Sequence, residues 1–448
     1  MKLSDAKAHF IGIGGVGMSA LAELFYMMGA QVSGSDLKNS KQTEYLEKIG
    51  VQVFIGHSEK NISDIDVVVY SSAIDEGNPE VQEARRKSIS IIPRAEALAE
   101  IMRYKRGIAV GGTHGKTTTT SMISSIFLDS DLDPTIAVGG RLKLIESTAR
   151  LGKGPWMVAE ADESDGSFSR LHPEIAIITN IDSDHLDHFG SFSNLQSAFK
   201  NFALNIPFYG SVIVNGDDPA TRLLFRNFPK RIFFYGEDEK NDFILNEDGD
   251  SFTVSHEGKI IGKIHLKVPG RHNALNALAA CIATHQTGVS WEKCFSGVNS
   301  YSGVDRRFQD IGEAGGIKVF DDYAHHPTEI NATLEGAKQR YGSGKIHVIY
   351  QPHRYSRTKD CWADYKSCFK NLDELYLVDI YPAGEVPIEG VDSLSLSSHI
   401  DAKTTYCSSF EEAVNKVVGN AVAGDIVLTM GAGHVWQCAS MVVEKINE

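Results

Sequence analysis

The sequence predicts an α/β protein with parallel sheets wound by helices, and three observations support this fold class. First, short apolar runs alternate with helical stretches along the first hundred residues; the runs are 8–13, 31–35, 51–55 and 66–70. Second, the pattern of strand, glycine turn and helix restarts at 106–110. Third, it restarts near 317–321 and 345–350. Such repeats are typical of doubly wound sheets, so we expect three α/β units in series.

Length and composition agree with this organisation. The chain has 448 residues, which corresponds to about three domains at roughly 150 residues each. Glycine and serine cluster around 104–107 and 296–303, which are the expected linkers. Hydrophobic residues make up 42% and charged residues 23%, so neither a disordered chain nor a fibre fits.

The charge balance narrows the range of partners. Lys and Arg total 44 against 58 Asp and Glu, a net charge of −14. This argues against broad binding to nucleic acid or to an anionic membrane, which needs a basic surface. It does not exclude a small phosphate-bearing ligand, because backbone N–H groups and one or two cations suffice for that.

The cysteines and the apolar runs point to a cytoplasmic protein. The six cysteines contain no C-x-x-C pair, so we expect free thiols and neither a disulfide framework nor a zinc site. The N-terminus runs into a strand with no export signal, and no apolar run approaches the ~20 residues that span a bilayer.

A first glycine loop follows the first strand. Gly12-Ile13-Gly14-Gly15-Val16-Gly17 matches G-x-G-x-x-G at the start of a helix, where the backbone approaches a diphosphate closely. Asp36 ends the second strand, where an acidic residue meets a ribose hydroxyl in dinucleotide folds. Ser71-Ser72-Ala73 ends a strand of the same sheet and offers either ligand contacts or a helix cap. The loop predicts a Rossmann-like domain at 1–105, with a ligand-free tight turn as the alternative, and does not distinguish NAD from another diphosphate.

A second glycine loop opens the second unit. In Val110-Gly111-Gly112-Thr113-His114-Gly115-Lys116-Thr117, followed by Thr118, backbone N–H groups can surround a β-phosphate. Lys116 can reach the β- and γ-oxygens, and the Thr117 hydroxyl can hold Mg²⁺. The full G-x-x-x-x-G-K-[ST] pattern needs Gly at 110, which is Val here. The loop predicts ATP binding by a central P-loop ATPase-like domain at 106–303, with His114 either in the site or facing solvent.

Two acidic segments follow later strands. Glu160, Asp162, Glu163 and Asp165 end one apolar run, and Asn180 to His188 ends another. If both strands flank the strand of the phosphate loop, their carboxyl ends converge on the γ-phosphate, where Mg²⁺ meets oxygen ligands and a His. Solvated loops are the alternative for acidic segments of this kind.

The C-terminal part, a second Rossmann-like domain at 304–448, carries polar residues at two strand ends. Asp321-Asp322-Tyr323-Ala324-His325-His326-Pro327-Thr328-Glu329 begins a helix, and capping explains Thr328 and Glu329 but not the His and Asp residues. Arg354 and Arg357, three residues apart, can together bind a carboxylate or phosphate, although a solvated face is the alternative.

Together these motifs resemble those of the Mur ligases, the ATP-dependent amide-bond-forming enzymes of peptidoglycan synthesis. The resemblance covers essentially the whole chain, in the order GIGGVGMSALA, GTHGKTTTT, EADESDGSF, NIDSDHLDHFG, HNALNALAA, DDYAHHPTEI and QPHRYSRT. The first and sixth segments are most similar to the members that join L-alanine to UDP-N-acetylmuramate through an acyl phosphate. We expect a monomer or a weak homodimer, although no sequence feature determines the oligomeric state.

The resemblance implies a role for each motif residue. The UDP-sugar would lie on Gly12 to Gly17, Asp36 and Ser71 to Ala73, and ATP on Gly112 to Thr118 with Asn276 facing the adenine. Mg²⁺ would be held by Thr117, Glu160 and His185, with Glu163 as the second choice for the acid. Lys116, Arg307 and Asp322 would act on the transferring phosphate, and the amino-acid pocket would consist of Tyr323, His325, Arg354 and Arg357. His325 would take a proton from the ammonium group or only orient the substrate.

Two departures from the family pattern stand out. No counterpart of the lysine carbamate of several sister ligases is found, so His185 is expected in its place. The segment Gly431-Ala432-Gly433-His434 carries His where relatives often have a smaller polar residue, which leaves the role of that loop open.

Four other functions compete with this interpretation. A murein peptide recycling ligase of the same family would use the same UDP-sugar, whereas a folylpolyglutamate-type ligase would not need the first glycine loop. An NAD(P)-dependent oxidoreductase would leave the second loop and its acids unexplained. A non-catalytic nucleotide sensor would not need every phosphate, metal and arginine position.

Overall fold

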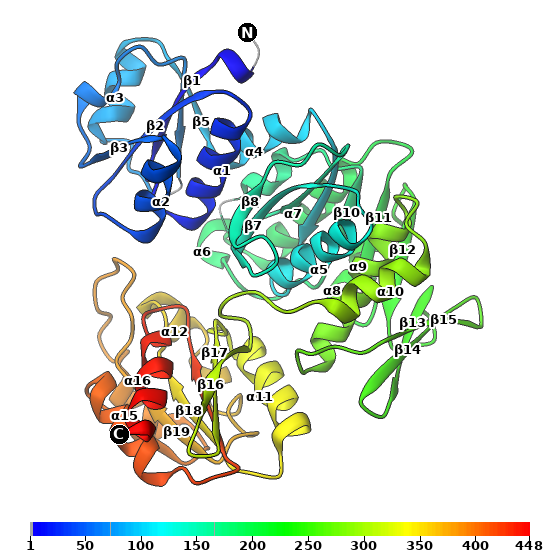
Figure 1. Ribbon diagram of the computed structural model, residues 1–448, viewed down its shortest axis with the longest axis vertical. Coiled ribbons are helices and arrows are strands. Elements are labelled where there is room, and N and C mark those ends of the chain that lie inside the picture. The colour runs from blue at the N-terminus through cyan, green and yellow to red at the C-terminus, as the bar shows by residue number, and fades with distance from the viewer. Residues whose placement is uncertain (1–2, 72, 165) are drawn as a thin grey trace. The chain divides into compact units, whose positions relative to one another are not determined.

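The computed structural model describes residues 3–71, 73–164 and 166–448, which belong to two compact units (Figure 1). The first unit comprises Met1–Leu266 and Ala274–Tyr301, and the second comprises Lys267–Asn273 and Ser302–Glu448. Ser72, predicted in the sugar-nucleotide site, lies outside the described residues. The predicted domain limits at 105/106 and 303/304 stay predictions.

The N-terminal part of the first unit is a five-stranded parallel sheet in the order β3-β2-β1-β4-β5. Its strands are β1 Lys7–Ile11, β2 Gln31–Asp36, β3 Gln52–Ile55, β4 Val67–Tyr70 and β5 Ser90–Pro93. Its α-helices are α1 Val16–Met27, α2 Lys41–Ile49, α3 Pro79–Arg86 and α4 Arg94–Met102. The four predicted strands are confirmed, and β1 lies where the strand order reverses, the usual place for a ligand.

Alternation along the strands explains why helices cover both faces of this sheet. Phe10 and Val69 are fully buried in the cluster that contains Leu21 of α1. Their sequence neighbours Ile11 and Val68 belong to a second cluster, formed with Val81 and Ala84 of α3. Such near-continuous apolar strands are typical of sheets buried on both sides.

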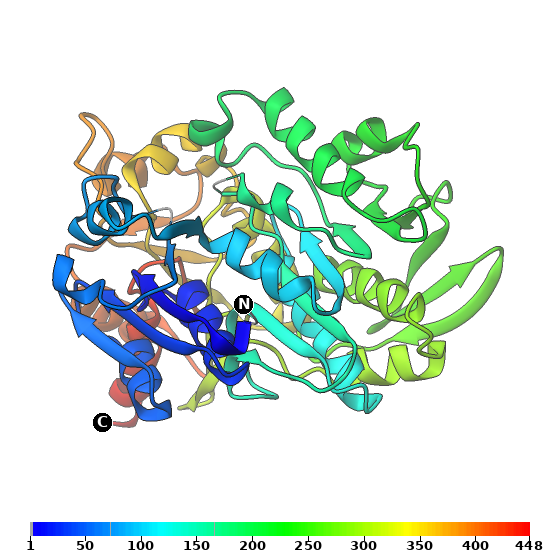
Figure 2. The same ribbon diagram turned by 90° about the horizontal axis from the view of Figure 1, so that it is seen from above.

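The rest of the first unit is a ten-stranded sheet in the order β15-β14-β13-β12-β11-β10-β6-β9-β7-β8. Its strands are β6 Arg106–Gly111, β7 Thr135–Leu142, β8 Ser147–Arg150, β9 Trp156–Glu160, β10 Ile175–Ile178, β11 Ser211–Asn215, β12 Ile232–Gly236, β13 Phe243–Asp248, β14 Ser251–His256 and β15 Lys259–Ile264. Its α-helices are α5 Lys116–Asp129, α6 Leu186–Phe189, α7 Phe192–Leu204, α8 Pro219–Phe225, α9 Arg271–His285 and α10 Trp291–Ser300. The antiparallel strands β13 to β15 form one end of the sheet, at the right of Figure 2.

The strands on either side of β6 bring both acidic segments to the edge of the sheet where the phosphate loop lies. Strand β6 pairs in parallel with β9 on one side and with β10 on the other. The prediction that both acidic segments follow strands beside the phosphate-loop strand is therefore confirmed.

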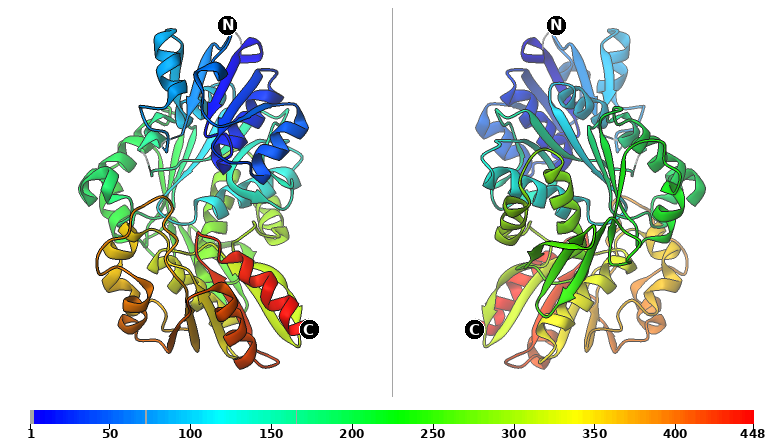
Figure 3. Two further views of the ribbon diagram at one scale, coloured as in Figure 1. Left: turned by 90° about the vertical axis from the view of Figure 1, so that its left-hand side faces the viewer. Right: turned by 90° about the vertical axis from the view of Figure 1, so that its right-hand side faces the viewer.

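The second unit is a six-stranded sheet in the order β16-β17-β21-β18-β19-β20, with only the edge strand β16 antiparallel among its described pairs. Its strands are β16 Gln309–Ala314, β17 Ile317–Asp322, β18 Ile346–Tyr350, β19 Glu374–Leu377, β20 Thr404–Tyr406 and β21 Ile426–Met430. Its α-helices are α11 Pro327–Tyr341, α12 Tyr355–Asp360, α13 Trp362–Tyr365, α14 Ser393–His399, α15 Phe410–Asn420 and α16 Trp436–Asn447. Helices lie on both faces of this sheet (Figure 3), and the predicted α/β fold class is confirmed.

The structure also tests the predicted linker at 296–303 and the predicted state of the cysteines. The linker predicted at 296–303 is wrong in its first half, because residues up to Ser300 belong to α10 and Gly297 packs against Ile126 of α5. All six cysteines are buried free thiols, as predicted. None of the described helices is long and apolar enough to cross a membrane.

Candidate functional site

The first glycine loop connects β1 to α1 and is held by the ends of β2 and β4. The N–H groups of Gly12 and Ile13 donate to the carbonyl oxygen of Ser35 at 2.8 and 3.0 Å. Gly12 has a φ of +81°, and a Cβ on it would lie 3.2 Å from the hydroxyl of Ser71. The structure thus brings Ser71 to the loop, as the sequence predicts.

Asp36 serves the loop itself. Its carboxylate accepts a hydrogen bond of 2.9 Å from the Gly14 N–H, so it fixes the turn at the edge of the sheet. A contact between Asp36 and a ribose stays a prediction.

A cavity of about 380 Å³ lies against this loop. Its wall includes Gly12, Gly15, Gly17, Ser71 and Ala73 from the N-terminal sheet, and Gly139, Glu160 and Asp162 from the central sheet. Arg94, the first residue of α4, also lines it. Arg94 is not among the site residues that the sequence motifs predict. It could have been found from its place directly after β5, a strand of the same sheet as the glycine loop.

The second glycine loop connects β6 to α5 and needs glycine for steric reasons. Gly112 has a φ of +135°, and a Cβ there would lie only 2.0 Å from the hydroxyl of Thr179. Gly115 has a φ of +82°, and its Cβ would lie 2.6 Å from the Asn276 side-chain oxygen. Asn276 therefore lies against the phosphate loop, and its contact with adenine stays a prediction.

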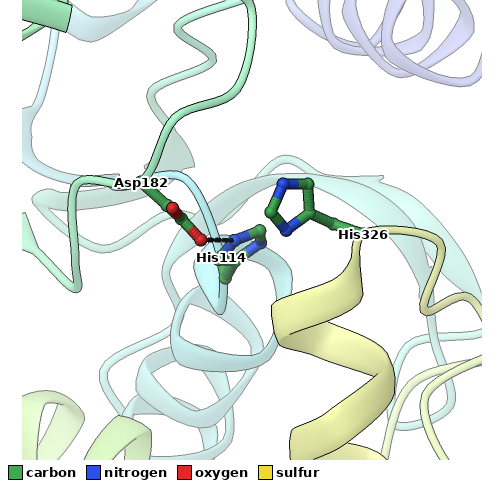
Figure 4. A group of neighbouring side chains, drawn as sticks. All are labelled: His114, Asp182 and His326. Atoms are coloured by element: carbon green, nitrogen blue, oxygen red, sulfur yellow. Dashed lines mark hydrogen bonds and ion pairs between the residues drawn. The ribbon is translucent and has the colours of Figure 1, made fainter. Parts of the chain in front are cut away.

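The segment after β10 holds the phosphate loop in place. Asn180 accepts from the His114 N–H at 2.9 Å, and the Asp182 N–H donates to the Thr113 hydroxyl at 2.9 Å. The His114 ring lies 3.1 Å from the Asp182 carboxylate, and its side chain is only 13% exposed (Figure 4). The alternative that His114 faces solvent is therefore wrong, because Asp182 holds the ring against the protein.

Lys116 lies in a cluster of buried charges. Its ammonium donates to a Glu163 oxygen at 2.8 Å and to the carbonyl oxygens of Gly112 and Thr113. Burial disfavours the charged form of Lys116, but the Glu163 and Asp162 carboxylates outweigh it and raise its pKa. Burial raises the pKa of Glu163 to about 7, against the opposing charge of Lys116. The cluster thus places a cation and a carboxylate at the mouth of the phosphate loop.

The predicted metal ligands are only partly brought together. The His185 Nε2 atom lies 3.8 Å from Glu163, and Thr117 is in the first turn of α5. Glu160 accepts a hydrogen bond of 2.7 Å from the Gly139 N–H. The hydroxyl and carboxylate oxygens present are donors that fit Mg²⁺, whereas the imidazole nitrogen of His185 is a donor that softer divalent cations prefer.

In the second unit, Asp322 organises the loop that follows β17. Its carboxylate accepts from the N–H groups of Phe308 and Ala324 at 2.7 and 2.8 Å. Burial raises its pKa to about 6, although the charge of Arg307 opposes the shift. Arg307 lies over the Tyr323 ring and 4.0 Å from Glu329.

The start of α11 fixes His325. His326 is the N-cap residue of α11 and forms a capping box with Glu329, which confirms a capping role for Glu329. The prediction that capping does not explain the His residues is therefore wrong for His326. The His325 N–H donates to Glu329 at 3.1 Å. The His325 Nδ1 atom lies 3.0 Å from the carbonyl oxygen of Tyr323. A carbonyl oxygen only accepts, so Nδ1 carries the proton and Nε2 is the basic nitrogen of the neutral ring.

The two predicted arginines have different partners. Arg354 donates to Glu385 at 2.6 Å, and Ser356 binds the same carboxylate. Arg357 is buried, with its guanidinium 3.3 Å from the His353 ring. Glu385 and His353 are residues that sequence reasoning missed, although His353 stands directly before Arg354.

Aromatic rings line the carboxyl end of this sheet in one row. Successive centroids lie 5.4, 5.9, 5.5 and 4.9 Å apart; the rings are those of Tyr323, His325, His353, Tyr381 and His434. His434, at the end of this row, has a structural role. Its ring packs edge-on against Tyr381, and its backbone N–H donates to the side-chain oxygen of Gln351.

Three family models match the chain in the order of these sites. The model of the Mur ligase family catalytic domain matches residues 7–106, the Mur ligase middle domain 110–284, and the Mur ligase glutamate ligase domain 306–433. Together they cover both glycine loops, both acidic segments and the C-terminal ring row up to Tyr381.

Relatives and solved structures agree with these matches. The chain is 55% identical over the full length of both chains to UDP-N-acetylmuramate–L-alanine ligase of Bdellovibrio bacteriovorus, and 46% identical over 98% of both chains to that of Geobacter sp. strain M21. It also resembles the crystal structure of UDP-N-acetylmuramate-alanine ligase from Thermotoga maritima, with a TM-score of 0.83 and 30% identity over 99% of both chains. A murein peptide ligase from Psychrobacter arcticus shares the fold, with a TM-score of 0.72 and 24% identity over 99% of both chains. The chain belongs to the Mur ligase family.

Proposed function

We propose that this protein uses ATP to join L-alanine to the lactyl carboxylate of UDP-N-acetylmuramate, in the cytoplasmic synthesis of peptidoglycan precursors. The observation that carries the proposal is the Lys116 cluster at a glycine loop, in the same unit as a cavity lined by a second glycine loop. The names of the full-length relatives support the choice of substrates.

The chemistry requires activation of the carboxylate. A carboxylate and an amine do not condense in neutral water, because the leaving group would be oxide or hydroxide. Attack of the lactyl carboxylate on the γ-phosphorus of ATP yields an acyl phosphate and ADP. In this step Lys116 exchanges Glu163 for phosphate oxygens and offsets the developing charge.

Mg²⁺ would be held by Thr117, His185 and one acidic residue, and would supply positive charge beside the phosphates. The family resemblance favours Glu160 as the acid, whereas the 3.8 Å separation from His185 supports Glu163. Glu160→Gln and Glu163→Gln separate the two. Binding of Mn²⁺ can be measured directly by its paramagnetic signal. The variant that loses the ligand should bind Mn²⁺ about tenfold more weakly than the wild type, and the other variant should bind it with unchanged affinity.

The second step forms the amide bond. The neutral amine of L-alanine attacks the acyl carbon, and inorganic phosphate leaves. His325 would take the proton of the ammonium group or only orient the substrate; the contact of its Nδ1 atom with the Tyr323 carbonyl oxygen supports the first role, because it leaves Nε2 as the basic nitrogen. Arg354 would hold the carboxylate of the amino acid in exchange for Glu385.

ADP release tests the proposal. Purified protein with ATP, Mg²⁺ and UDP-N-acetylmuramate should form ADP with L-alanine, and the scan should include glycine, L-serine and an L-alanyl tripeptide. A preference for the tripeptide would instead make the protein a recycling ligase. Absence of ADP formation with every acceptor would contradict the proposal, and an NAD(P)H-binding assay would then test the oxidoreductase alternative.

A further inference from the structure

Arg94 connects the first glycine loop to the central sheet, yet none of the sequence motifs contains it. A Cβ on Gly17, in the first turn of α1, would lie 2.9 Å from the Nη1 atom of Arg94. The guanidinium therefore lies against the start of α1, and it lines the cavity beside Gly12 and Ser71.

The other edge of this guanidinium is held from the central sheet. The Arg94 Nη2 atom donates to the Asp162 carboxylate at 2.7 Å, across 68 positions of the sequence. Asp162 follows β9, lines the same cavity, and accepts at its second oxygen from the Ser164 N–H at 3.1 Å. Because a guanidinium has five N–H donors in one plane, a single carboxylate on Nη2 leaves donors for a second anion.

We propose that Arg94 binds the diphosphate of the sugar nucleotide together with the N–H groups at the start of α1, and that Asp162 is the residue that positions Arg94. The proposal rests on the proposed function in one respect, that a sugar nucleotide occupies this cavity. A helix start attracts an anion, and a planar cation beside it can form two parallel hydrogen bonds to phosphate oxygens.

The neighbouring acid has a different partner, which makes the proposal specific. Glu163, the next residue, binds Lys116 of the phosphate loop. Loss of the Asp162 carboxylate should therefore weaken binding of the diphosphate, because Arg94 loses the group that positions it. The partner of Lys116 should remain.

Binding of UDP to the full-length protein, measured by titration calorimetry without ATP, tests this directly. Arg94→Ala should weaken UDP binding about ten- to a hundredfold, the loss of a charge-assisted hydrogen-bond pair. Arg94→Lys should recover only part of this, because a lysine cannot form the two-pronged contact. Uridine, which has no phosphate, should bind all variants equally.

Asp162→Ala should weaken UDP binding about three- to tenfold, and it should have no further effect when Arg94 is already alanine. The matched control is Arg170→Ala, which removes the ion pair between Arg170 and Glu96 of the same helix α4 but does not touch the cavity. This control should leave UDP binding unchanged, and thermal melting should show every variant folded.

The outcomes separate the two proposals. If the wild-type protein binds neither UDP nor UDP-N-acetylmuramate, the proposed function fails. Unchanged UDP binding by Arg94→Ala, beside normal binding by the wild type, overturns the role of Arg94. A loss for UDP-N-acetylmuramate but not for UDP assigns Arg94 to the lactyl carboxylate and overturns the diphosphate assignment. Independent, multiplying losses in the double variant overturn the positioning role of Asp162.

Discussion

The two glycine loops of the first unit look alike in sequence but are stabilised differently. The first loop joins β1 to α1, and the second joins β6 to α5. The first loop carries no cation, and Arg94 of another helix lies beside it. The second carries Lys116 within the loop, already paired with Glu163. A glycine pattern thus predicts the shape of a phosphate site, whereas its charges depend on the rest of the fold.

The buried acids near the two loops differ in the same way. Glu80, below the first loop, accepts hydrogen bonds from Ser35 and Asn61. Burial works to raise its pKa, but the His9 imidazole and these hydrogen bonds outweigh it and lower the pKa to about 2. Glu163 has a pKa raised to about 7 instead. The surroundings of Glu80 therefore favour its charged form, whereas burial disfavours the charged form of Glu163.

The largest effect should come from removing the cation of the second loop. Lys116→Ala should lower kcat by at least ~10³-fold, because no other residue of the loop offsets the charge of the transferring phosphate. UDP binding should persist, since the first loop does not use Lys116. Steady-state kinetics and calorimetry on the same variant check both statements, and near-normal ligation would remove Lys116 from the ATP site.

Exchanging a glycine in each loop compares their packing. Gly112→Ala should cost about 1–3 kcal/mol in the free energy of unfolding and weaken ATP binding, because its Cβ meets Thr179 at 2.0 Å. Gly15→Ala should change stability by no more than about 0.5 kcal/mol, because its Cβ lies 3.5 Å from the nearest backbone oxygen. Denaturant unfolding of both variants gives the comparison, and equal losses would contradict it.

The amino-acid pocket should respond separately from both loops. Arg354→Ala should raise KM for L-alanine about tenfold or more, with little change in KM for ATP, since it removes the proposed carboxylate partner. Ser356→Ala, which also loses a hydrogen bond to Glu385, is the matched control and should leave both constants close to normal. An unchanged KM for L-alanine in the arginine variant would remove Arg354 from the pocket.

The last comparison concerns stability alone, in the network of Glu80 beside the first loop. Glu80→Gln should lower the free energy of unfolding by about 2–4 kcal/mol at pH 7, because buried hydrogen bonds to a charge are lost. Because the pKa of Glu80 is lower in the folded protein, its charged form stabilises the fold at pH values above its ordinary pKa of 4.5. This contribution to the free energy of unfolding disappears as the pH falls towards 2. The gap between variant and wild type should therefore close in acid. Glu76→Gln, in an exposed pair with Arg85, should show no such dependence.

The sequence predicted the elements that local chemistry determines. Short apolar strands, the two glycine turns and the cap at Glu329 depend on a few neighbouring residues, and each was confirmed. The ion pairs depend on strand order instead. Lys116 and Glu163 meet only because β9 pairs with β6, and Arg94 meets Asp162 across 68 positions. Roles assigned by family resemblance, such as those of Asp322 and Asn276, gained contacts in the structure but stay predictions.

One consequence of the adjacent acids concerns how nucleotides arrive. Arg94 with Asp162 and Lys116 with Glu163 sum to zero formal charge, in a chain whose net charge is −14. An anion in solution is therefore not drawn towards these loops from a distance, and added salt should not slow its association, because it screens the net negative charge of the chain. Recognition begins only on contact, when phosphate oxygens replace Glu163 at Lys116 in the second loop or bind Arg94 beside Asp162 at the first.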